Sequence, residues 1–142
     1  MPTVDELIGA ARVQAARRVV RATDADTLRQ MAELVEIPAP PFGEAARGGY
    51  VLDRFRDLGL ADVHRDEAGN VLATLPRAAA PDAAPVLVAA HLDTVFEEHT
   101  DVRLRRDGDR WCAPGISDNV RGLAALLALA RCCTEASVRT HR

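Results

Sequence analysis

Apolar residues recur at a helical period through the first part of the chain. Over about Asp24–Glu36 they lie three or four positions apart, a spacing that places them on one face of a helix. A similar pattern over about Glu44–Leu58 predicts another helix, with Gly59 as its left-handed C-terminal cap. The Ala- and Arg-rich stretch Asp5–Arg21 favours a helix through its residue types. This part of the chain is therefore predicted to be helical.

The apolar pattern then changes to one that is typical of strands. Val63–Arg65 and Val71–Leu75 are predicted to be two short strands, joined by the turn-forming segment Asp66–Asn70. The continuous apolar run Val86–Ala90 is typical of a strand that is covered on both faces. We therefore expect a sheet that contains these three segments.

A hairpin and an apolar helix follow. Alternating residues between Val102 and Trp111, with Asp107-Gly108 as the turn, predict the hairpin, and an apolar stripe predicts a helix over about Asn119–Arg131. Helices, then strands, then a strand–loop–helix unit indicate an α/β fold with a mixed sheet. Functional sites in such sheets form beyond the carboxyl ends of the strands, which here means directly after Ala90.

Composition and charge exclude several classes of protein. The formal net charge is −3, and no basic run indicates a nucleic acid or an anionic membrane as partner. The longest apolar stretch, Leu123–Ala130, is too short to cross a bilayer, and the N-terminus does not resemble a secretory signal. Cys112, Cys132 and Cys133 fit neither a disulfide framework nor a CxxC zinc site. A cytoplasmic protein is expected.

His91-Leu92-Asp93 directly follows the predicted strand. In extended backbone, residues two apart project to the same side, so the imidazole of His91 and the carboxylate of Asp93 can touch. Such a carboxylate fixes the imidazole tautomer and leaves the other ring nitrogen free for a metal ion. Alternatively, the two residues only end a strand and begin a turn.

Asp118 precedes the last predicted helix, in the segment Ala113–Asn119. Its carboxylate could cap that helix by accepting hydrogen bonds from free amides of the first turn. The alternative is that Asp118 lies beside His91 and binds a metal with it, since Pro114 and Gly115 allow the loop to bend sharply.

Taken together, these motifs resemble a known group of enzymes. His91–Val95 at a strand end, a hairpin, and Gly115–Asn119 before an apolar helix are similar to the dinuclear zinc exopeptidases and amidohydrolases. That group includes peptidase T, glutamate carboxypeptidase, aminoacylase and the desuccinylases. The resemblance extends upstream through Ile37–Pro40, Leu58–Leu60 and Asp66–Val71, and covers about residues 27–139.

The resemblance implies a three-layer α/β/α fold and a site for two zinc ions, with cobalt or manganese as substitutes. His91 would bind one zinc, Asp93 would orient His91, and Asp118 would bridge both ions, often with a cis peptide bond to Asn119. The paired ions would activate water to hydrolyse a peptide or amide bond in a small peptide or N-acyl amino acid.

Other parts of the family pattern have no counterpart in the chain. Relatives continue with an acidic pair that contains the general base, with further zinc ligands, and with a lid domain through which they often form homodimers. Glu97-Glu98 is an acidic pair, but it precedes Asp118, and we interpret it as a solvated loop feature.

We therefore expect residues 1–142 to be the N-terminal part of a zinc peptidase catalytic domain, with residues 1–25 as a helical extension. The chain alone is expected to be inactive and to self-associate through an unpaired sheet edge. The alternative is a truncated or degenerate domain that binds no metal.

Overall fold

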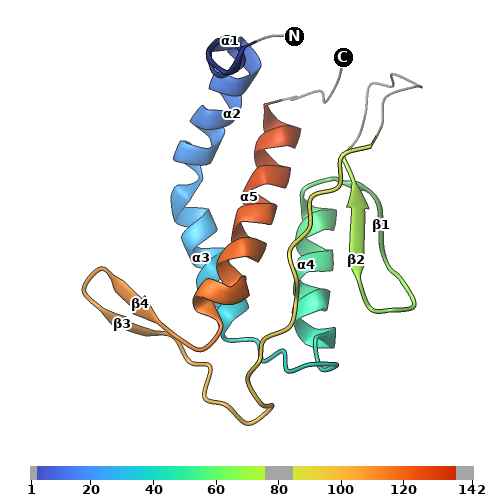
Figure 1. The fold of residues 1–142 in the computed structure, drawn as a ribbon, viewed down its shortest axis with the longest axis vertical. Coiled ribbons are helices and arrows are strands. Elements are labelled where there is room, and N and C mark those ends of the chain that lie inside the picture. The colour runs from blue at the N-terminus through green and yellow to red at the C-terminus, as the bar shows by residue number, and fades with distance from the viewer. Residues whose placement is uncertain (1–2, 76–84, 137–142) are drawn as a thin grey trace.

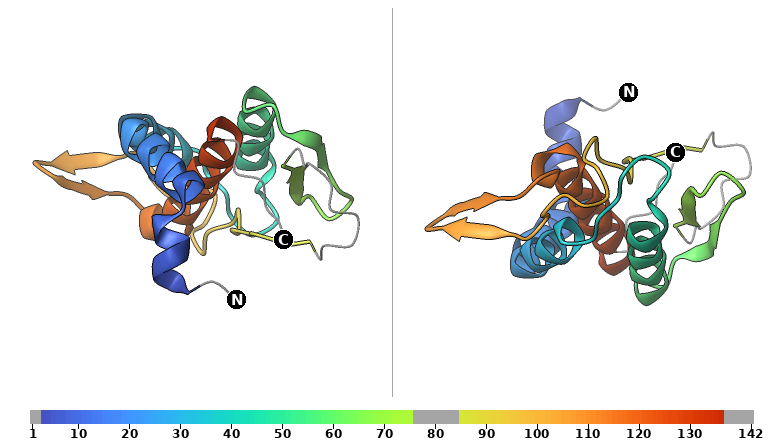
Figure 2. Two further views of the ribbon diagram at one scale, coloured as in Figure 1. Left: turned by 90° about the horizontal axis from the view of Figure 1, so that it is seen from above. Right: turned by 90° about the horizontal axis from the view of Figure 1, so that it is seen from below.

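The computed structural model describes residues 3–75 and 85–136, in which helices form the centre and hairpins the periphery (Figure 1). The α-helices are α1 (Val4–Gly9), α2 (Ala11–Ala22), α3 (Asp24–Val35), α4 (Ala45–Asp57) and α5 (Arg121–Glu135), and the π-helical turn η1 (Ile116–Val120) directly precedes α5. The strands are β1 (Ala61–Arg65), β2 (Val71–Thr74), β3 (Arg105–Asp107) and β4 (Arg110–Cys112). Figure 2 shows the two hairpins on opposite sides of the helices. None of the helices in the described ranges has the length and apolar character needed to span a membrane.

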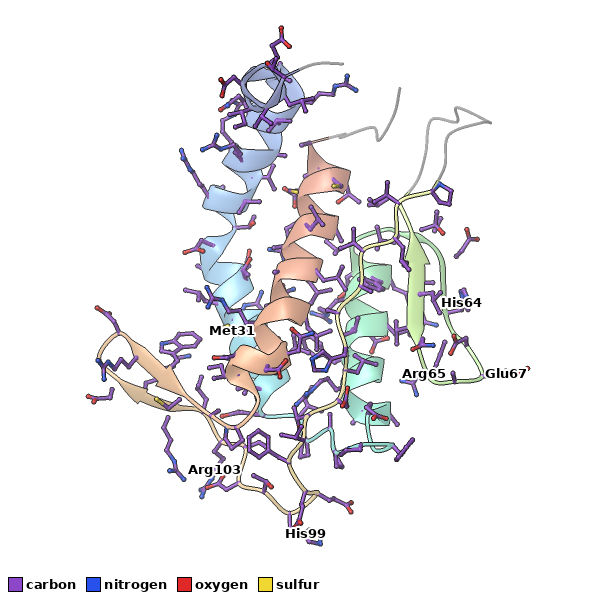
Figure 3. The ribbon with its side chains drawn as sticks, viewed as in Figure 1. Met31, His64, Arg65, Glu67, His99 and Arg103 are labelled. Carbon is purple, nitrogen blue, oxygen red and sulfur yellow. The ribbon has the colours of Figure 1, made fainter. Side chains whose placement is uncertain are left out.

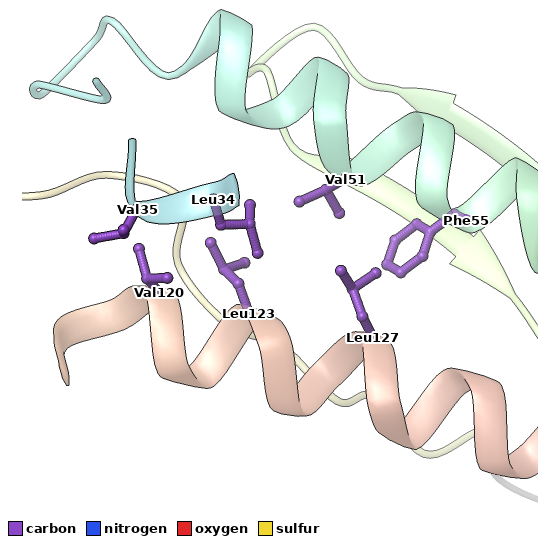
Figure 4. Close-up of a cluster of buried hydrophobic side chains, with 7 residues drawn as sticks. All are labelled: Leu34, Val35, Val51, Phe55, Val120, Leu123 and Leu127. Atoms are coloured by element: carbon purple, nitrogen blue, oxygen red, sulfur yellow. The ribbon is translucent and has the colours of Figure 1, made fainter. Parts of the chain in front are cut away.

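The core is an interface between α5 and the helices on either side of it (Figure 4). Apolar residues four positions apart on α5 and on α4 face one another, and the last turn of α3 closes one end. The buried cluster contains Leu34, Val35, Val51, Phe55, Val120, Leu123 and Leu127. Burial of such side chains is the main favourable contribution to folding, at about 1.5–3 kcal/mol each. The predicted apolar stripe of the last helix is confirmed.

The helix predicted over Asp5–Arg21 is wrong in one respect, because two helices occupy this stretch. α1 ends at Gly9 and α2 begins at Ala11, with an extended residue, Ala10, between them. Glycine is among the weakest helix-forming residues, because its backbone loses the most conformational freedom in a helix. The helix therefore breaks where its sequence favours it least.

The predicted boundaries of α3 and α4 are confirmed to within a residue or two. α3 ends at Val35, just before a proline-rich loop that cannot continue a helix. Gly59 follows α4 with a φ of +70°, and its amide donates to the carbonyl of Arg56. This is the left-handed helix end that the sequence predicted.

Both predicted hairpins are present as antiparallel pairs. The β1–β2 pair packs on α4, and its turn is fixed by Asp66, whose carboxylate accepts from both the backbone and the side chain of Asn70. The β3–β4 hairpin carries Trp111 with the guanidinium of Arg106 over its ring. Cys112 lies exposed on this hairpin.

The predicted strand at Val86–Ala90 is not formed. Within the described residues this segment pairs with no strand, and Leu87 is 86% exposed. A strand needs a hydrogen-bonding partner, and no described segment takes that position beside it. The chain does combine helices and strands, but its described strands form two separate antiparallel pairs in place of one mixed sheet.

Candidate metal centre

His91 lies between two carboxylates that come from different parts of the chain. Its Nδ1 is 3.0 Å from Oδ1 of Asp93, and its Nε2 is 2.9 Å from Oδ1 of Asp118. The pairing with Asp93 follows from the two-residue spacing that the sequence predicted. The pairing with Asp118 joins residues 27 positions apart and brings the loop before α5 to the end of the Val86–Ala90 segment.

The two carboxylates change the proton affinity of the imidazole. They raise the pKa of His91, with the hydrogen bond to Asp118 as the largest cause, while burial acts in the opposite direction. Because each ring nitrogen faces an acceptor, the doubly protonated ring is stabilised. A cation that binds to Nε2 has to replace the proton on that nitrogen.

Asp118 does not cap α5, so the capping interpretation is wrong. The helix proper begins at Arg121, and no side chain caps its N-terminus. Asp118 has extended backbone angles (φ −131°, ψ 94°), and its side chain is 85% exposed. Asp118 lies two positions before Val120, the N-cap residue of the helix, and its carboxylate contacts His91 instead.

The residues around Asp118 fit the loop closely against the His91 segment. The peptide bond between Asp118 and Asn119 is cis, as the resemblance implies. The side chain of Asn119 donates to the carbonyl oxygen of His91 over 3.4 Å. The same side chain lies against Gly122, where an added Cβ would overlap the side-chain amide of Asn119. Asn119 and Gly122 thus help to hold the two segments together.

Gly115 makes the bend before Asp118 possible. Its φ is +77°, and a Cβ at this position would lie 2.7 Å from Cγ2 of Thr94. Residues with a side chain rarely adopt this backbone conformation, and here the space is also filled. The predicted sharp bend at Pro114 and Gly115 is therefore present, and it brings the loop against Thr94.

Sequence reasoning missed Arg47 and Thr94. Arg47 is 1% exposed, and its two Nη atoms donate to the carbonyl oxygens of Leu92 (2.8 Å) and Ile37 (2.6 Å). The backbone amide and the hydroxyl of Thr94 both donate to the carbonyl oxygen of Ala39, over 2.8 and 3.2 Å.

One signal for Arg47 was available in the sequence. Arg47, Val51 and Phe55 are spaced four apart, so the arginine occupies a position on the buried face of α4. A charged residue on such a face is rare unless it has partners in the interior.

Other candidate ligands lie elsewhere. His64 and His99 are exposed, and Figure 3 shows them on the β1–β2 side and on the loop after the His91 segment. Glu97 and Glu98 are exposed in that same loop, as expected. Within residues 3–75 and 85–136, no three His, Cys, Asp or Glu side chains gather where they could hold a metal ion.

Two surface grooves also lie apart from His91. One runs between α3 and the β3–β4 hairpin, and the other lies between the proline-rich loop after α3 and the loop that contains His99. His91, Asp93 and Asp118 line neither groove. The exposed side chains of His91 and Asp118 place the candidate centre at the surface.

Comparison with known proteins places the chain in a family. The profile of peptidase family M28 matches residues 70–142, just over half of the chain, and the match includes His91, Asp93 and Asp118. A search of curated proteins returned no match. The upstream motifs Ile37–Pro40 and Leu58–Leu60 lie outside the matched region. The predicted resemblance to zinc-dependent peptidases is confirmed at the level of the family, and the chain belongs to peptidase family M28, whose members are metallopeptidases that generally depend on zinc.

Proposed function

We propose that this chain supplies part of the zinc-binding catalytic centre of a metallopeptidase, with His91 and Asp118 as ligands and Asp93 as the residue that orients His91. The carrying observation is the 2.9 Å approach of the His91 imidazole to the Asp118 carboxylate, from segments far apart in the sequence. The substrate would be a small peptide or an N-acyl amino acid. The three-layer α/β/α fold of the complete domain and its dimerisation belong to the same proposal.

The chemistry of these side chains fits a zinc ion. Imidazole nitrogen and carboxylate oxygen are ligands that zinc uses in proteins. The side chains of His91 and Asp118 are 48% and 85% exposed, so a cation can reach both from solvent. Asp93 accepts a hydrogen bond from Nδ1, which leaves Nε2 as the metal-binding nitrogen once its proton is lost. Zinc bound here would polarise a scissile carbonyl and lower the pKa of a bound water.

Asp118 is also suited to a second cation. A carboxylate has two oxygens, and only Oδ1 of Asp118 contacts His91 in the described part of the chain. The exposed position of the side chain leaves Oδ2 able to bind another ion, which is the bridging role that the resemblance implies.

Cobalt binding provides the test of this site. We expect the full chain to bind Co²⁺, seen as visible absorption, and to release it to Zn²⁺. Asp93→Ala should weaken binding about 10–100-fold, since it removes the partner that orients a ligand. His91→Ala and Asp118→Ala should weaken it further. His64→Ala and His99→Ala are matched controls that remove exposed histidines and should leave the affinity unchanged.

Equal affinity in His91→Ala and in the unsubstituted chain would contradict the proposed ligand. Absence of Co²⁺ binding by a folded chain would instead favour the alternative function, a domain that retains the motif without binding metal.

We further expect the chain by itself not to hydrolyse peptides. Catalytic zinc sites use about three protein ligands and a water molecule, whereas His91 and Asp118 supply two. No di- or tripeptide should be cleaved in the presence of added zinc or cobalt, as measured by release of free amino acids. Turnover that is lost in His91→Ala would show that the site is complete and would contradict this expectation.

A further inference from the structure

The segment that carries His91 and Asp93 is held without a sheet. Residues 91–94 are not part of a strand in the described structure, so ladder hydrogen bonds do not fix their backbone. Two metal ligands and their supporting groups need to be held to within about 0.5 Å of a productive geometry. Other contacts must therefore provide this support.

Arg47 provides one of these contacts from the interior of the protein. Its guanidinium reaches from α4 to the carbonyl oxygen of Leu92, the residue between His91 and Asp93, and to the carbonyl oxygen of Ile37. Burial lowers the pKa of Arg47, and the nearby charge of Asp93 partly offsets this effect. A buried guanidinium is costly unless its donors are hydrogen-bonded, so the two carbonyl contacts matter for the fold as well.

Thr94 provides a second contact on the other side of Asp93. Its amide and hydroxyl both donate to the carbonyl oxygen of Ala39, and the residue is buried. The backbone on either side of Asp93 is thus attached to the same proline-rich loop. Displacement of the backbone at Leu92 would move the neighbouring side chains relative to Asp118, and the Arg47 hydrogen bond opposes that displacement.

We propose that Arg47 is a positioning residue of the metal centre, which fixes the Leu92 carbonyl and thereby aims His91 and Asp93, with Thr94 as the second attachment. This inference rests on the proposed function for its metal-binding consequence. Its geometric consequence, a fixed His91 segment, holds in the metal-free chain as well.

A second buried arginine serves as a control that separates a positioning role of Arg47 from a purely structural one. Arg131 of α5 is also buried, and its Nη2 donates to Gln30, remote from His91. Arg47→Met and Arg131→Met should both lower the melting temperature. Only Arg47→Met should weaken Co²⁺ binding, by about 10–100-fold, the range found for residues that support metal ligands. Wild-type affinity in Arg47→Met, or an equal loss in both variants, would overturn the proposal.

A measurement on the metal-free chain separates this inference from the proposed function. In Arg47→Met, amide hydrogen exchange at Thr94 should become faster, and the nuclear Overhauser contacts between the Asn119 side-chain amide and the backbone of His91 should be lost. Arg131→Met should retain both. If the wild-type chain binds no Co²⁺, the proposed function fails, and these two signals still decide the role of Arg47.

Two milder variants cover the case in which Arg47→Met does not fold. Arg47→Lys keeps the charge but cannot donate to both carbonyls with the same fork, so an intermediate effect on exchange at Thr94 is expected. Thr94→Val removes only the hydroxyl contact. It should also weaken the Overhauser contacts between Asn119 and the backbone of His91. Wild-type behaviour of both variants in these measurements would overturn the proposal.

Discussion

Gly115 combines two constraints at one residue, a left-handed backbone and a close neighbour. At Gly69, in the β1–β2 turn, φ is also positive, at +90°, but nothing lies within 4 Å of an added Cβ. A comparison of Gly115 with Gly69 therefore separates the free-energy cost of the backbone conformation from the cost of the contact with Thr94.

Gly115→Ala should destabilise the chain more than Gly69→Ala. Both substitutions force a left-handed non-glycine residue, at about 1–2 kcal/mol. Overlap with Thr94 should add about 1–3 kcal/mol at Gly115 alone. Urea unfolding followed by helical circular dichroism measures the difference. Equal losses in the two variants would mean that the loop can move away from Thr94 at no cost.

At the same scale, sequence identified the residues whose partners are either near in the chain or part of a known pattern. His91 and Asp93 follow from a two-residue spacing, and Asp118 follows from a motif before a helix. The roles of Arg47 and Thr94 at the site could not be found in this way, because Leu92 lies 45 residues from Arg47 and Ala39 lies 55 residues from Thr94. Only the fold brings these groups together, and a local pattern contains no information about it.

The contact between α3 and α4 includes one polar pair with consequences for pH. The hydroxyl of Tyr50 donates to Glu33 over 2.6 Å. Burial, followed by this hydrogen bond, raises the pKa of Tyr50, and the same hydrogen bond is the largest cause that lowers the pKa of Glu33. Tyr50 is the one tyrosine of the chain, so its titration can be isolated.

Tyr50→Phe should reduce stability at neutral pH and weaken its dependence on alkaline pH. Loss of the hydrogen bond costs about 1 kcal/mol. Unfolded tyrosine ionises near pH 10 and the folded residue only at higher pH, so the stability from Tyr50 is complete below about pH 10 and declines above it. Unfolding curves from about pH 7 to 11 measure this.

Glu33→Gln is the matched control for this pair. The stability from the Glu33 carboxylate is present above its unfolded pKa of about 4.3 and is lost as pH falls. In Glu33→Gln, the free energy of unfolding should therefore depend less on pH in the acid range. It should retain a decline above about pH 10, since Tyr50 remains buried. An alkaline decline that is the same in Tyr50→Phe and in the unsubstituted chain would contradict the assignment.

Elements were predictable where their determinants are local. The periodicity of α3, α4 and α5 and the turn residues of both hairpins specify these elements within short windows. The break at Gly9 is also determined locally. The prediction of a single helix missed it, because the high helix propensity of the surrounding residues outweighed that of one glycine. The strand predicted at Val86–Ala90 was wrong for another reason, because an apolar run becomes a strand only when a neighbouring strand supplies its hydrogen bonds.

The whole molecule exposes this apolar segment to solvent. Val86, Leu87 and Val88 are all exposed in an extended stretch, a combination that favours pairing with another chain. The separate hairpins leave the predicted mixed sheet unassembled in the described residues, so the family fold could be inferred from the motifs but not from these strands.

We expect the isolated chain to self-associate, and Leu87→Lys to reduce that association. A charge on an exposed extended segment opposes edge-to-edge pairing. Sedimentation velocity over a range of concentrations measures the effect. Val4→Lys introduces the same charge at an exposed apolar residue of α1 and should leave the association unchanged. A monodisperse monomer of the unsubstituted chain would contradict this expectation.

The position of Trp111 has a spectroscopic consequence. It is the sole tryptophan, and it lies on the peripheral β3–β4 hairpin beneath Arg106, with the guanidinium carbon 4.1 Å from the ring centre. Its fluorescence emission therefore reports on the surroundings of the hairpin, whereas ellipticity reports on the helices. Coincident thermal curves from both signals would show that the periphery and the helical centre melt as one cooperative unit.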